Sequence, residues 1–234
     1  MAISKIVAIG GGDIKNGTTY PIDKFIMSLA DKKNPKALFV PTASEDAPLY
    51  WQAFNDMYGK KLKCRTDALF LINTNQTSKD IGDKILNADI IYVGGGNTYM
   101  MLKIWKEQNV DKYLKMAYQK GVVLAGLSAG AMCWFEYGLS DAPQFNDTES
   151  EELVKLKGLG LVKGINCPHA YDESFRCGPF EKLIMKEKKL AGVAIDDLAA
   201  LAIVGNKPSV IRARANRHVY KITAGKNGCL RERL

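Results

Sequence analysis

Short apolar runs that alternate with helix-patterned segments are the feature that most restricts the fold of this 234-residue chain. The runs are rich in β-branched residues and end in glycine, proline or a polar residue, which is typical of strands. Several are apolar throughout, which indicates strands covered on both faces by helices. The predicted strands are Lys5–Gly10, Ala37–Pro41, Ala68–Ile72, Ile90–Val93 and Val122–Leu127.

Between these runs, apolar residues recur with the spacing of amphipathic helices. The predicted helices are Ile22–Asp31, Ala47–Tyr58, Ser78–Asn87, Thr98–Glu107 and Val110–Lys120. Such an alternation of strands and helices favours a parallel sheet with right-handed crossovers. We therefore expect an α/β protein, a three-layer α/β/α sandwich with a mostly parallel sheet. No repeat or linker interrupts the pattern, so we expect a single domain over residues 1–234.

The pattern changes after Ser128. The helix predicted there extends past Glu136, whose carboxylate we place on the helix surface. Residues 140–150 are polar and loop-like, 158–168 form a glycine-punctuated strand region, and 180–190 form a helix. Four short strands with hairpin-like spacing follow, at Val193–Ile195, Leu201–Val204, Val210–Arg214 and Val219–Ile222.

The formal net charge of +8 raises the possibility of nucleic-acid binding. Much of the excess lies in short local runs, and Arg212 and Arg214 alternate as on the solvated side of an edge strand. No nucleic-acid-binding motif accompanies them, so we expect no nucleic-acid partner. The charge can instead attract anionic substrates by steering.

Several further patterns bear on location and cofactors. The first residues do not have the long apolar stretch of a secretory signal, and no apolar run reaches the roughly 18 residues of a membrane span. Five widely spaced cysteines without a CxxC pair indicate reduced thiols rather than disulfides or a zinc site. We expect a cytoplasmic protein, monomeric or homodimeric, that uses no metal, cofactor or membrane partner.

The sequence Gly126-Leu127-Ser128-Ala129-Gly130 carries the strongest chemical signal, because it joins a buried strand to a helix. A sharp strand-to-helix turn lifts a serine hydroxyl out of the sheet, and small neighbours tolerate the strained backbone. The N-terminus of the helix directs free amides toward developing negative charge. The alternative is a serine that caps the helix, with glycines for close packing. We favour Ser128 as a nucleophile.

A serine hydroxyl needs a general base at neutral pH, and the chain has two histidines. His169 follows an apolar strand and a proline-fixed turn, whereas His218 lies among cations on a peripheral strand. We therefore predict His169 as the base and His218 as a surface residue. The acid that would orient the imidazole stays open between Asp141, Asp196 and Asp197.

Two glycine-rich turns follow predicted strands, at residues 10–12 and 94–96. Neither matches GxGxxG or a P-loop, so mononucleotide binding is a weakly supported alternative. Glycines at the carboxyl ends of parallel strands allow the backbone to approach a ligand. We predict that Gly95 or Gly96, together with the amide of Ala129, forms an oxyanion hole. Asn97 either caps the next helix or contacts substrate.

Taken together, these motifs resemble the peptidase E and cyanophycinase family of serine peptidases, relatives of the class I glutamine amidotransferase-like folds. The matching segments are Gly94-Gly95-Gly96-Asn97-Thr98, Gly126-Leu127-Ser128-Ala129-Gly130-Ala131 and Asn166-Cys167-Pro168-His169. The resemblance implies a flavodoxin-like sandwich with a serine nucleophile, a histidine base and an oxyanion amide in the glycine turn. These roles fall on Ser128, His169 and the Gly95-Gly96 turn. The family's acid corresponds to Asp141 or to the Asp196-Asp197 pair.

The resemblance also bears on the substrate. Peptidase E members release an N-terminal aspartate from dipeptides, and an arginine after the histidine reads the aspartyl carboxylate. Arg176 matches that arginine by position, and its guanidinium suits a bidentate clamp. The alternative is a solvated arginine near Asp172 and Glu173. The aromatic residues after the serine and the segment after Asp141 depart from the aspartyl dipeptidase pattern.

We expect a serine hydrolase that acts on short peptides with an acidic N-terminal residue. One alternative is an amidase or cyanophycinase-like peptidase that uses the same residues on another acyl group. The other is a ligand-binding module that has the same fold and no turnover.

Overall fold

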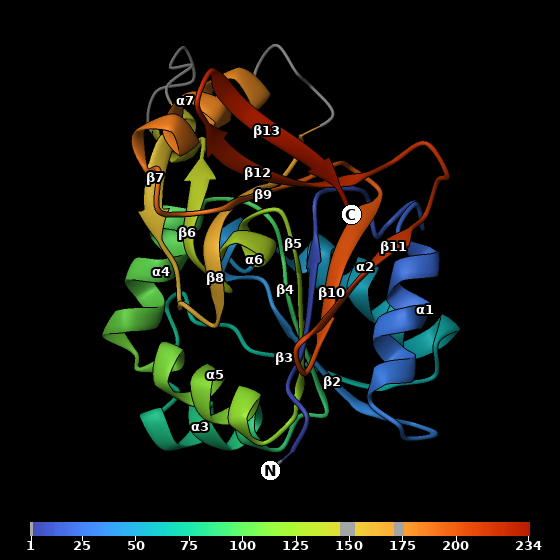
Figure 1. Cartoon of the computed structure of the whole chain (residues 1–234). Helices are drawn as coiled ribbons and strands as arrows, with labels where there is room; N and C mark the ends of the chain where they lie inside the picture. Colours follow the sequence, from blue (N-terminus) through green and yellow to red (C-terminus); the bar gives the residue numbers. More distant parts are fainter. Residues whose placement is uncertain (1, 146–152, 171–175) are drawn as a thin grey trace.

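A seven-stranded sheet forms the centre of the protein in the computed structural model, which describes residues 2–145, 153–170 and 176–234 (Figure 1). Its strands are β1 (Lys5–Ile9), β2 (Lys36–Val40), β3 (Arg65–Ala68), β4 (Ile90–Val93), β5 (Val123–Leu127), β10 (Ala199–Val204) and β11 (Lys207–Arg212). They lie in the order β11-β10-β1-β5-β4-β2-β3. Strands β1 to β5 are mutually parallel, and β10 and β11 extend the sheet antiparallel beyond β1.

Helices cover both faces of this sheet, which confirms the three-layer α/β/α arrangement. They are α1 (Tyr20–Leu29), α2 (Pro48–Phe54) with its π-helical continuation Asn55–Lys61, α3 (Ser78–Leu86), α4 (Thr98–Glu107) and α5 (Val110–Gln119). Helices α1 and α2 pack against one face, where Ile22 and Phe54 join a core with Phe39 of β2. Helices α3, α4 and α5 pack against the other, where Trp105 and Leu114 are fully buried. Within the described ranges, no helix is long and apolar enough to cross a membrane.

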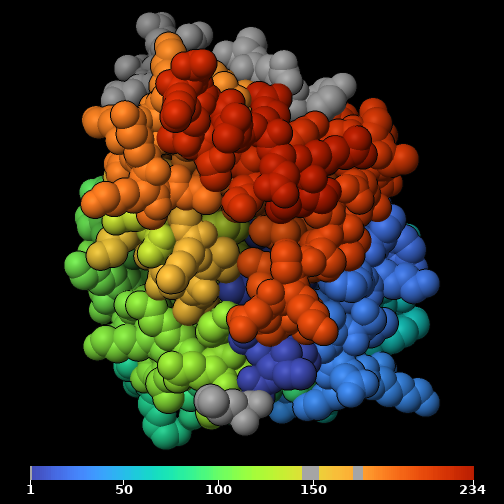
Figure 2. Space-filling model, in the orientation of Figure 1, coloured from blue at the N-terminus to red at the C-terminus, as the bar shows by residue number. Residues whose placement is uncertain are grey.

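A second sheet of six strands lies beyond the edge at which the parallel strands end (Figure 1). Its strands are β6 (Phe135–Ser140), β7 (Val154–Lys157), β8 (Val162–Cys167), β9 (Gly192–Ile195), β12 (Val219–Gly225) and β13 (Gly228–Arg233), in the order β13-β12-β9-β8-β6-β7. Helix α7 (Gly178–Lys186) buries Phe180 and Ile184 against it. In the space-filling view, β12 and β13 form one continuous surface with the end of β11 (Figure 2).

The late strands divide between the two sheets. Strand β9 pairs with β8 and β12, whereas β10 pairs with β1 and β11. The hairpin-like spacing correctly indicates the pairing of β10 with β11 but does not hold for β9 and β10. The connection between these two strands, Asp196–Leu198, therefore passes from one sheet to the other.

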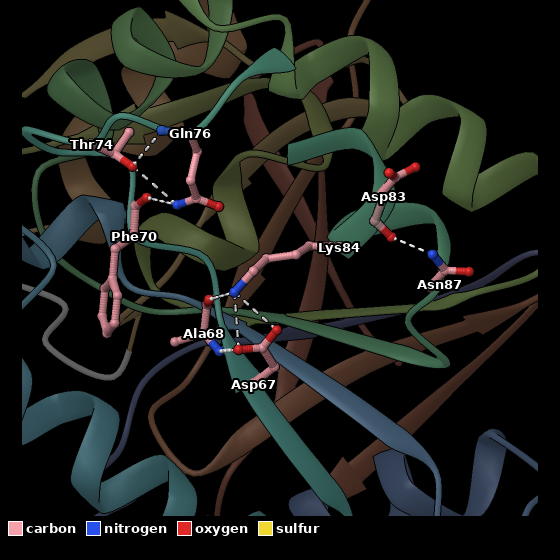
Figure 3. A network of polar contacts seen from close by, with 8 residues as sticks. All are labelled: Asp67, Ala68, Phe70, Thr74, Gln76, Asp83, Lys84 and Asn87. Atoms are coloured by element: carbon pink, nitrogen blue, oxygen red, sulfur yellow. Dashed lines mark hydrogen bonds and ion pairs between the residues drawn. The ribbon is translucent and has the colours of Figure 1, made fainter. Parts of the chain in front are cut away.

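The predicted strand Ala68–Ile72 is wrong by several residues, since β3 ends at Ala68. Around this point, side chains form hydrogen bonds with backbone groups of the run (Figure 3). Asp67 accepts the Ala68 N–H, the Lys84 ammonium donates to the Ala68 carbonyl, and Gln76 donates to the Phe70 carbonyl. Because these groups are satisfied locally, the apolar run continues as a loop rather than as sheet.

The long helix predicted after Ser128 is also wrong. Helix α6 has only four residues, Ala129–Met132, and β6 begins at Phe135. Glu136 therefore lies in a strand, where its carboxylate accepts the N–H of Gly164 at 2.8 Å. Buried Trp134 directly precedes this strand, and the buried aromatic ring of Phe135 fits a strand that pairs with neighbours on both sides.

Candidate active site

The turn at Ser128 has the geometry of a strained strand-to-helix elbow. Ser128 follows β5, precedes α6, and has φ 56° and ψ −110°, a backbone conformation that L-residues rarely adopt. The flanking glycines make the turn possible, since a Cβ at Gly126 would lie 2.2 Å from the Gly130 carbonyl oxygen. A Cβ at Gly130 would lie equally close to the carbonyl oxygen of Val93. The glycines of this motif are therefore required by backbone packing.

Sheet order explains why the elbow faces both glycine-rich turns. Strand β5 lies between β1 and β4, and all three are parallel. Their carboxyl ends place residues 10–12 on one side of Ser128 and residues 94–96 on the other. A crevice at the carboxyl ends of adjacent parallel strands is where ligands bind in open α/β sheets.

His169 and Asp197 complete a hydrogen-bonded chain that begins at Ser128. The Nε2 atom of His169 lies 2.7 Å from the Ser128 Oγ, and its Nδ1 lies 2.7 Å from Asp197 Oδ1. The side chains of His169 and Asp197 are 33% and 43% exposed, so the site is open to solvent. The three residues come from three places: the end of β5, the turn after β8, and the connection between β9 and β10.

Backbone contacts fix the positions of these two side chains against β1. The His169 N–H donates to the Gly10 carbonyl at 3.2 Å, and the Leu198 N–H donates to the Gly11 carbonyl at 2.9 Å. His169 itself has a positive φ of 56°, as Ser128 does. The backbone around these side chains is thus held by hydrogen bonds between the turn after β1 and two segments that come later in the chain.

The charge state of Asp197 suits a group that orients an imidazole. Its hydrogen bond with His169 lowers the pKa of the Asp197 carboxyl, although partial burial acts in the opposite direction. An ionised Asp197 accepts a hydrogen from Nδ1 of His169. That tautomer leaves Nε2 as an acceptor for the Ser128 hydroxyl, which is the arrangement that a general base requires.

The other two candidate acids do not contact His169. Asp196 points the other way and accepts the backbone N–H of His218 at 2.8 Å, and burial raises its pKa. Asp141 accepts a hydrogen bond from Nη2 of Arg176 at 2.6 Å. Of the three alternatives that the sequence left open, the structure brings Asp197 against the imidazole. His218, expected at the surface, is half-buried beside Tyr220.

The two candidate substrate-binding residues, Arg176 and Asn97, both have partners within the protein. Arg176 is 6% exposed and forms an ion pair with Asp141. The acidic neighbours proposed as its alternative partners, Asp172 and Glu173, lie outside the described residues. Asn97 accepts the N–H of Met100 at 3.0 Å and so caps α4, which is the capping role that the sequence also allowed.

The predicted oxyanion amides lie around the elbow. Ala129 is the first residue of α6, where an N–H has no partner within the helix. The N–H of Gly95 donates to the Tyr50 hydroxyl at 3.3 Å. Gly96 has φ 132°, and a Cβ there would lie 2.1 Å from the carbonyl oxygen of Ala43. The turn after β4 therefore packs closely against the backbone at Ala43, and it also lies beside Ser128.

Sequence reasoning missed the part that Gly11 plays. A Cβ on this residue would lie 2.0 Å from Asp197 Oδ1 and 2.6 Å from the imidazole of His169. Because Gly11 has no side chain, it leaves the room in which the side chains of His169 and Asp197 meet. The run of three glycines after β1 was the available signal, but it pointed to the approach of a ligand. Among the described residues, no three His, Cys, Asp or Glu side chains gather as a metal site would need.

Comparison with known proteins identifies the family. The family model for peptidase family S51 matches residues 6–211. The uncharacterized peptidase YgaJ of Bacillus subtilis (strain 168) is 34% identical over 222 residues, which cover 94% of this chain and 92% of that protein. A Peptidase E of Actinobacillus pleuropneumoniae serotype 5b (strain L20) is 34% identical over 104 residues, 44% of this chain and 42% of that one.

Solved structures share the fold. The crystal structure of a putative peptidase E protein from Listeria monocytogenes EGD-e superposes with a TM-score of 0.66 at 22% identity, over 90% of this chain and 99% of that one. A peptidase from an acI-B1 Actinobacterium gives 0.71 at 18% identity, over 98% and 97%. With the family model matching most of the chain, the protein belongs to the serine peptidase family S51 and is a hydrolase.

Proposed function

We propose that this peptidase cleaves short peptides through Ser128 as nucleophile, His169 as general base and Asp197 as the acid that orients the base. The observation that carries the proposal is the chain of two 2.7 Å hydrogen bonds from Asp197 through His169 to the Ser128 Oγ. The strained turn at Ser128 supports it, because strain of this kind is found at nucleophile elbows.

The reaction follows from the hydrogen-bond pattern. Ser128 Oγ attacks the acyl carbon of the substrate as its proton passes to His169 Nε2. The tetrahedral intermediate collapses, the C–N bond breaks, and the amine leaves with the proton that His169 returns. Water then attacks the acyl-enzyme with His169 again acting as base, which releases the acid and restores Ser128. Asp197 stabilises the imidazolium that forms in both halves.

We propose peptides with an acidic N-terminal residue as the substrates. The net charge of +8 favours the approach of anions, and Arg176 is a cation behind the histidine turn. Its guanidinium forms an ion pair with Asp141. A substrate carboxylate would therefore share or replace that partner. Because the preference for acidic substrates depends on this exchange of partners, it is a separate claim from the hydrolytic chemistry.

The chemistry is tested with a fluorophosphonate probe and intact-mass analysis. The wild-type protein should gain one adduct, and Ser128→Ala should gain none. Ser44→Ala is the matched control, because this hydroxyl donates to the carbonyl of its own turn at Pro41. A wild-type protein that stays unlabelled, or a Ser128→Ala protein that labels, would refute the nucleophile and favour a ligand-binding module without turnover.

The substrate claim is tested by comparing Asp-, Ala- and Arg-linked amides. Preference for the Asp-linked compound supports the acidic peptide. Equal turnover of all three would refute that preference and favour an amidase or cyanophycinase-like peptidase that uses another acyl group.

A further inference from the structure

Tyr50 is held at the candidate active site by packing that leaves its ring little freedom. It lies in α2, and its ring packs edge-on against that of buried Phe39 with centroids 5.0 Å apart. Gly94 also adjoins the ring, since a Cβ there would lie 2.9 Å from Cε1 of Tyr50 and 3.3 Å from Cζ of Phe39. Because Gly94, the first glycine of the turn after β4, has no Cβ, the ring of Tyr50 can occupy this position.

The Tyr50 hydroxyl lies beside the turn after β4, which adjoins the turn that carries the nucleophile. It accepts the N–H of Gly95 at 3.3 Å. Gly95 in turn lies against the elbow, since a Cβ built on it would be 3.4 Å from the Cβ of Ser128. In this structure, therefore, the amide of Gly95, one of those predicted to bind the oxyanion, donates to Tyr50 instead.

Tyr50 also lines a pocket between α2 and the turn after β1. A pocket of about 240 Å³ lies between residues 12–15, which follow β1, and Leu49, Tyr50 and Ala53 of α2. Leu49 is 76% exposed at the rim. Gly11, which precedes this lining in the chain, lies beside the imidazole of His169, since a Cβ built on it would be 2.6 Å from the ring. The Tyr50 side chain therefore lines a pocket next to the candidate active site, while its hydroxyl is buried.

The hydrogen of this hydroxyl is available. Burial raises the pKa of Tyr50 to about 12, and the nearby carboxylates of Asp23 and Asp13 act in the same direction. The hydroxyl therefore keeps its hydrogen throughout the neutral range. Within the described part of the chain, the hydrogen bond from Gly95 is the only one that this hydroxyl makes, and in that bond it is the acceptor.

We propose that Tyr50 is a catalytic residue, whose O–H donates to the substrate oxygen that becomes negative when Ser128 attacks. This proposal rests on the proposed function. The Gly95 N–H polarises the phenol, so a relay runs from the Gly95 N–H to the Tyr50 O–H and then to the oxyanion. The N–H of Ala129 supplies the direct backbone donor. In this arrangement, Gly95 acts on the oxyanion through the Tyr50 side chain, which the glycine motif in the sequence does not indicate.

The test is Tyr50→Phe, which removes one hydroxyl and keeps the ring against Phe39 and Gly94. Loss of one oxyanion donor lowers turnover by roughly 10²–10³-fold. We expect a loss of this size in kcat with KM and the thermal unfolding midpoint little changed. The matched control is Tyr92→Phe. Its hydroxyl is buried without a hydrogen-bond partner among the described residues, two positions before Gly94 in the same segment. This variant should keep wild-type turnover.

A peptide aldehyde separates a donor from a merely structural residue. Its hemiacetal with Ser128 places an oxygen where the oxyanion forms, so its affinity should fall by the same factor as kcat/KM in Tyr50→Phe. The affinity for a product acid, which does not form this adduct, should not change. Equal losses for both ligands, or a lowered unfolding midpoint, would overturn the proposal.

The outcome also distinguishes this proposal from the one on which it rests. If the fluorophosphonate labels wild type and Tyr50→Phe to completion and both turn over substrate equally, the role of Tyr50 is refuted while the serine mechanism stands. If the wild type neither labels nor turns over an amide, the serine mechanism itself is refuted.

Discussion

The two sheets of this protein make different contributions to one site. The seven-stranded sheet supplies Ser128 from its middle strand β5, with glycine-rich turns on both neighbouring strands. The six-stranded sheet supplies His169 from the end of β8. Asp197 belongs to neither, because it lies in the connection through which the chain passes from β9 to β10.

This difference shows where the precision of the site comes from. The first sheet places the serine with its own strands, since the elbow lies in five consecutive residues and packs against Val93 of β4. The histidine and the acid reach it only if the second sheet docks correctly on the first. Hydrogen bonds from His169 to Gly10 and from Leu198 to Gly11 hold that docking. A substitution at the junction should therefore damage activity more than an equal one elsewhere.

The largest effect is expected at the connection between the sheets. Asp197→Asn keeps the shape of the side chain but removes the charge that selects the Nδ1–H tautomer of His169. We expect kcat to fall by roughly 10⁴-fold. Asp196→Asn is the control, because its oxygen can still accept the N–H of His218, and it should lose less than tenfold. Comparable losses from both would show that the junction, rather than the charge on Asp197, is what matters.

The next effect tests the space between the sheets. In Gly11→Ala, a methyl group would lie 2.0 Å from Asp197 Oδ1 and 2.6 Å from His169, so both must move. A displacement near 1 Å at a reacting group costs about 10²-fold in rate. Gly178→Ala is matched, since a Cβ there meets nothing within 4 Å. Steady-state kinetics on the two proteins compares them, and a Gly11→Ala enzyme as active as Gly178→Ala would contradict the crowding.

The same contrast explains what the sequence could predict. Strands of the first sheet are continuous apolar runs between amphipathic helices, so their order along the chain indicated the sandwich and the elbow at Ser128. The helix predicted through Glu136 failed because an aromatic run such as Trp134-Phe135 has no period of its own. Its assignment to a strand depends on β7 and β8, which come later in the chain.

The carboxylate that contacts His169 could not be chosen from the sequence for a related reason. Asp196 and Asp197 are adjacent, and in an extended segment successive side chains point to opposite sides. The choice depends on which of them faces β1 when the chain changes sheets. The roles of Gly11 and of the Tyr50 hydroxyl likewise depend on residues that are distant in the sequence. Local patterns show that a site exists, whereas its contacts follow from topology.

A smaller effect concerns Arg176, which lies on the side of the second sheet. Arg176→Lys keeps the positive charge but loses the planar fork that binds a carboxylate at two points. If this residue reads the substrate, kcat/KM for an Asp-linked amide should fall by about tenfold, and that for an Ala-linked amide should change little. Equal changes for the two substrates would assign Arg176 to the structural pair with Asp141 alone.

The smallest effect on catalysis, and a sizeable one on stability, is expected beneath the first sheet. Asp23 of α1 is fully buried and accepts hydrogen bonds from the hydroxyls of Thr19 and Tyr58 at 2.8 and 3.0 Å. Burial nevertheless raises its pKa from 3.8 to about 6. The folded protein thus binds a proton that the unfolded chain has already released, so the stabilising contribution is complete below about pH 4. It is lost as the pH rises through about 6.

The rise of the Asp23 pKa from 3.8 to about 6 corresponds to roughly 3 kcal/mol of unfolding free energy. Urea unfolding at several pH values should therefore show that Asp23→Asn gains stability relative to wild type between about pH 4 and pH 6, and then keeps a constant difference. Asp80→Asn is the control of opposite sign. Hydrogen bonds from Thr77 lower the pKa of Asp80, so its contribution is lost as the pH falls. Turnover at neutral pH should be the same in wild type and Asp23→Asn. If turnover changes together with stability, the helix layer and the junction are coupled, and the division of roles between the two sheets is not as sharp as the hydrogen bonds indicate.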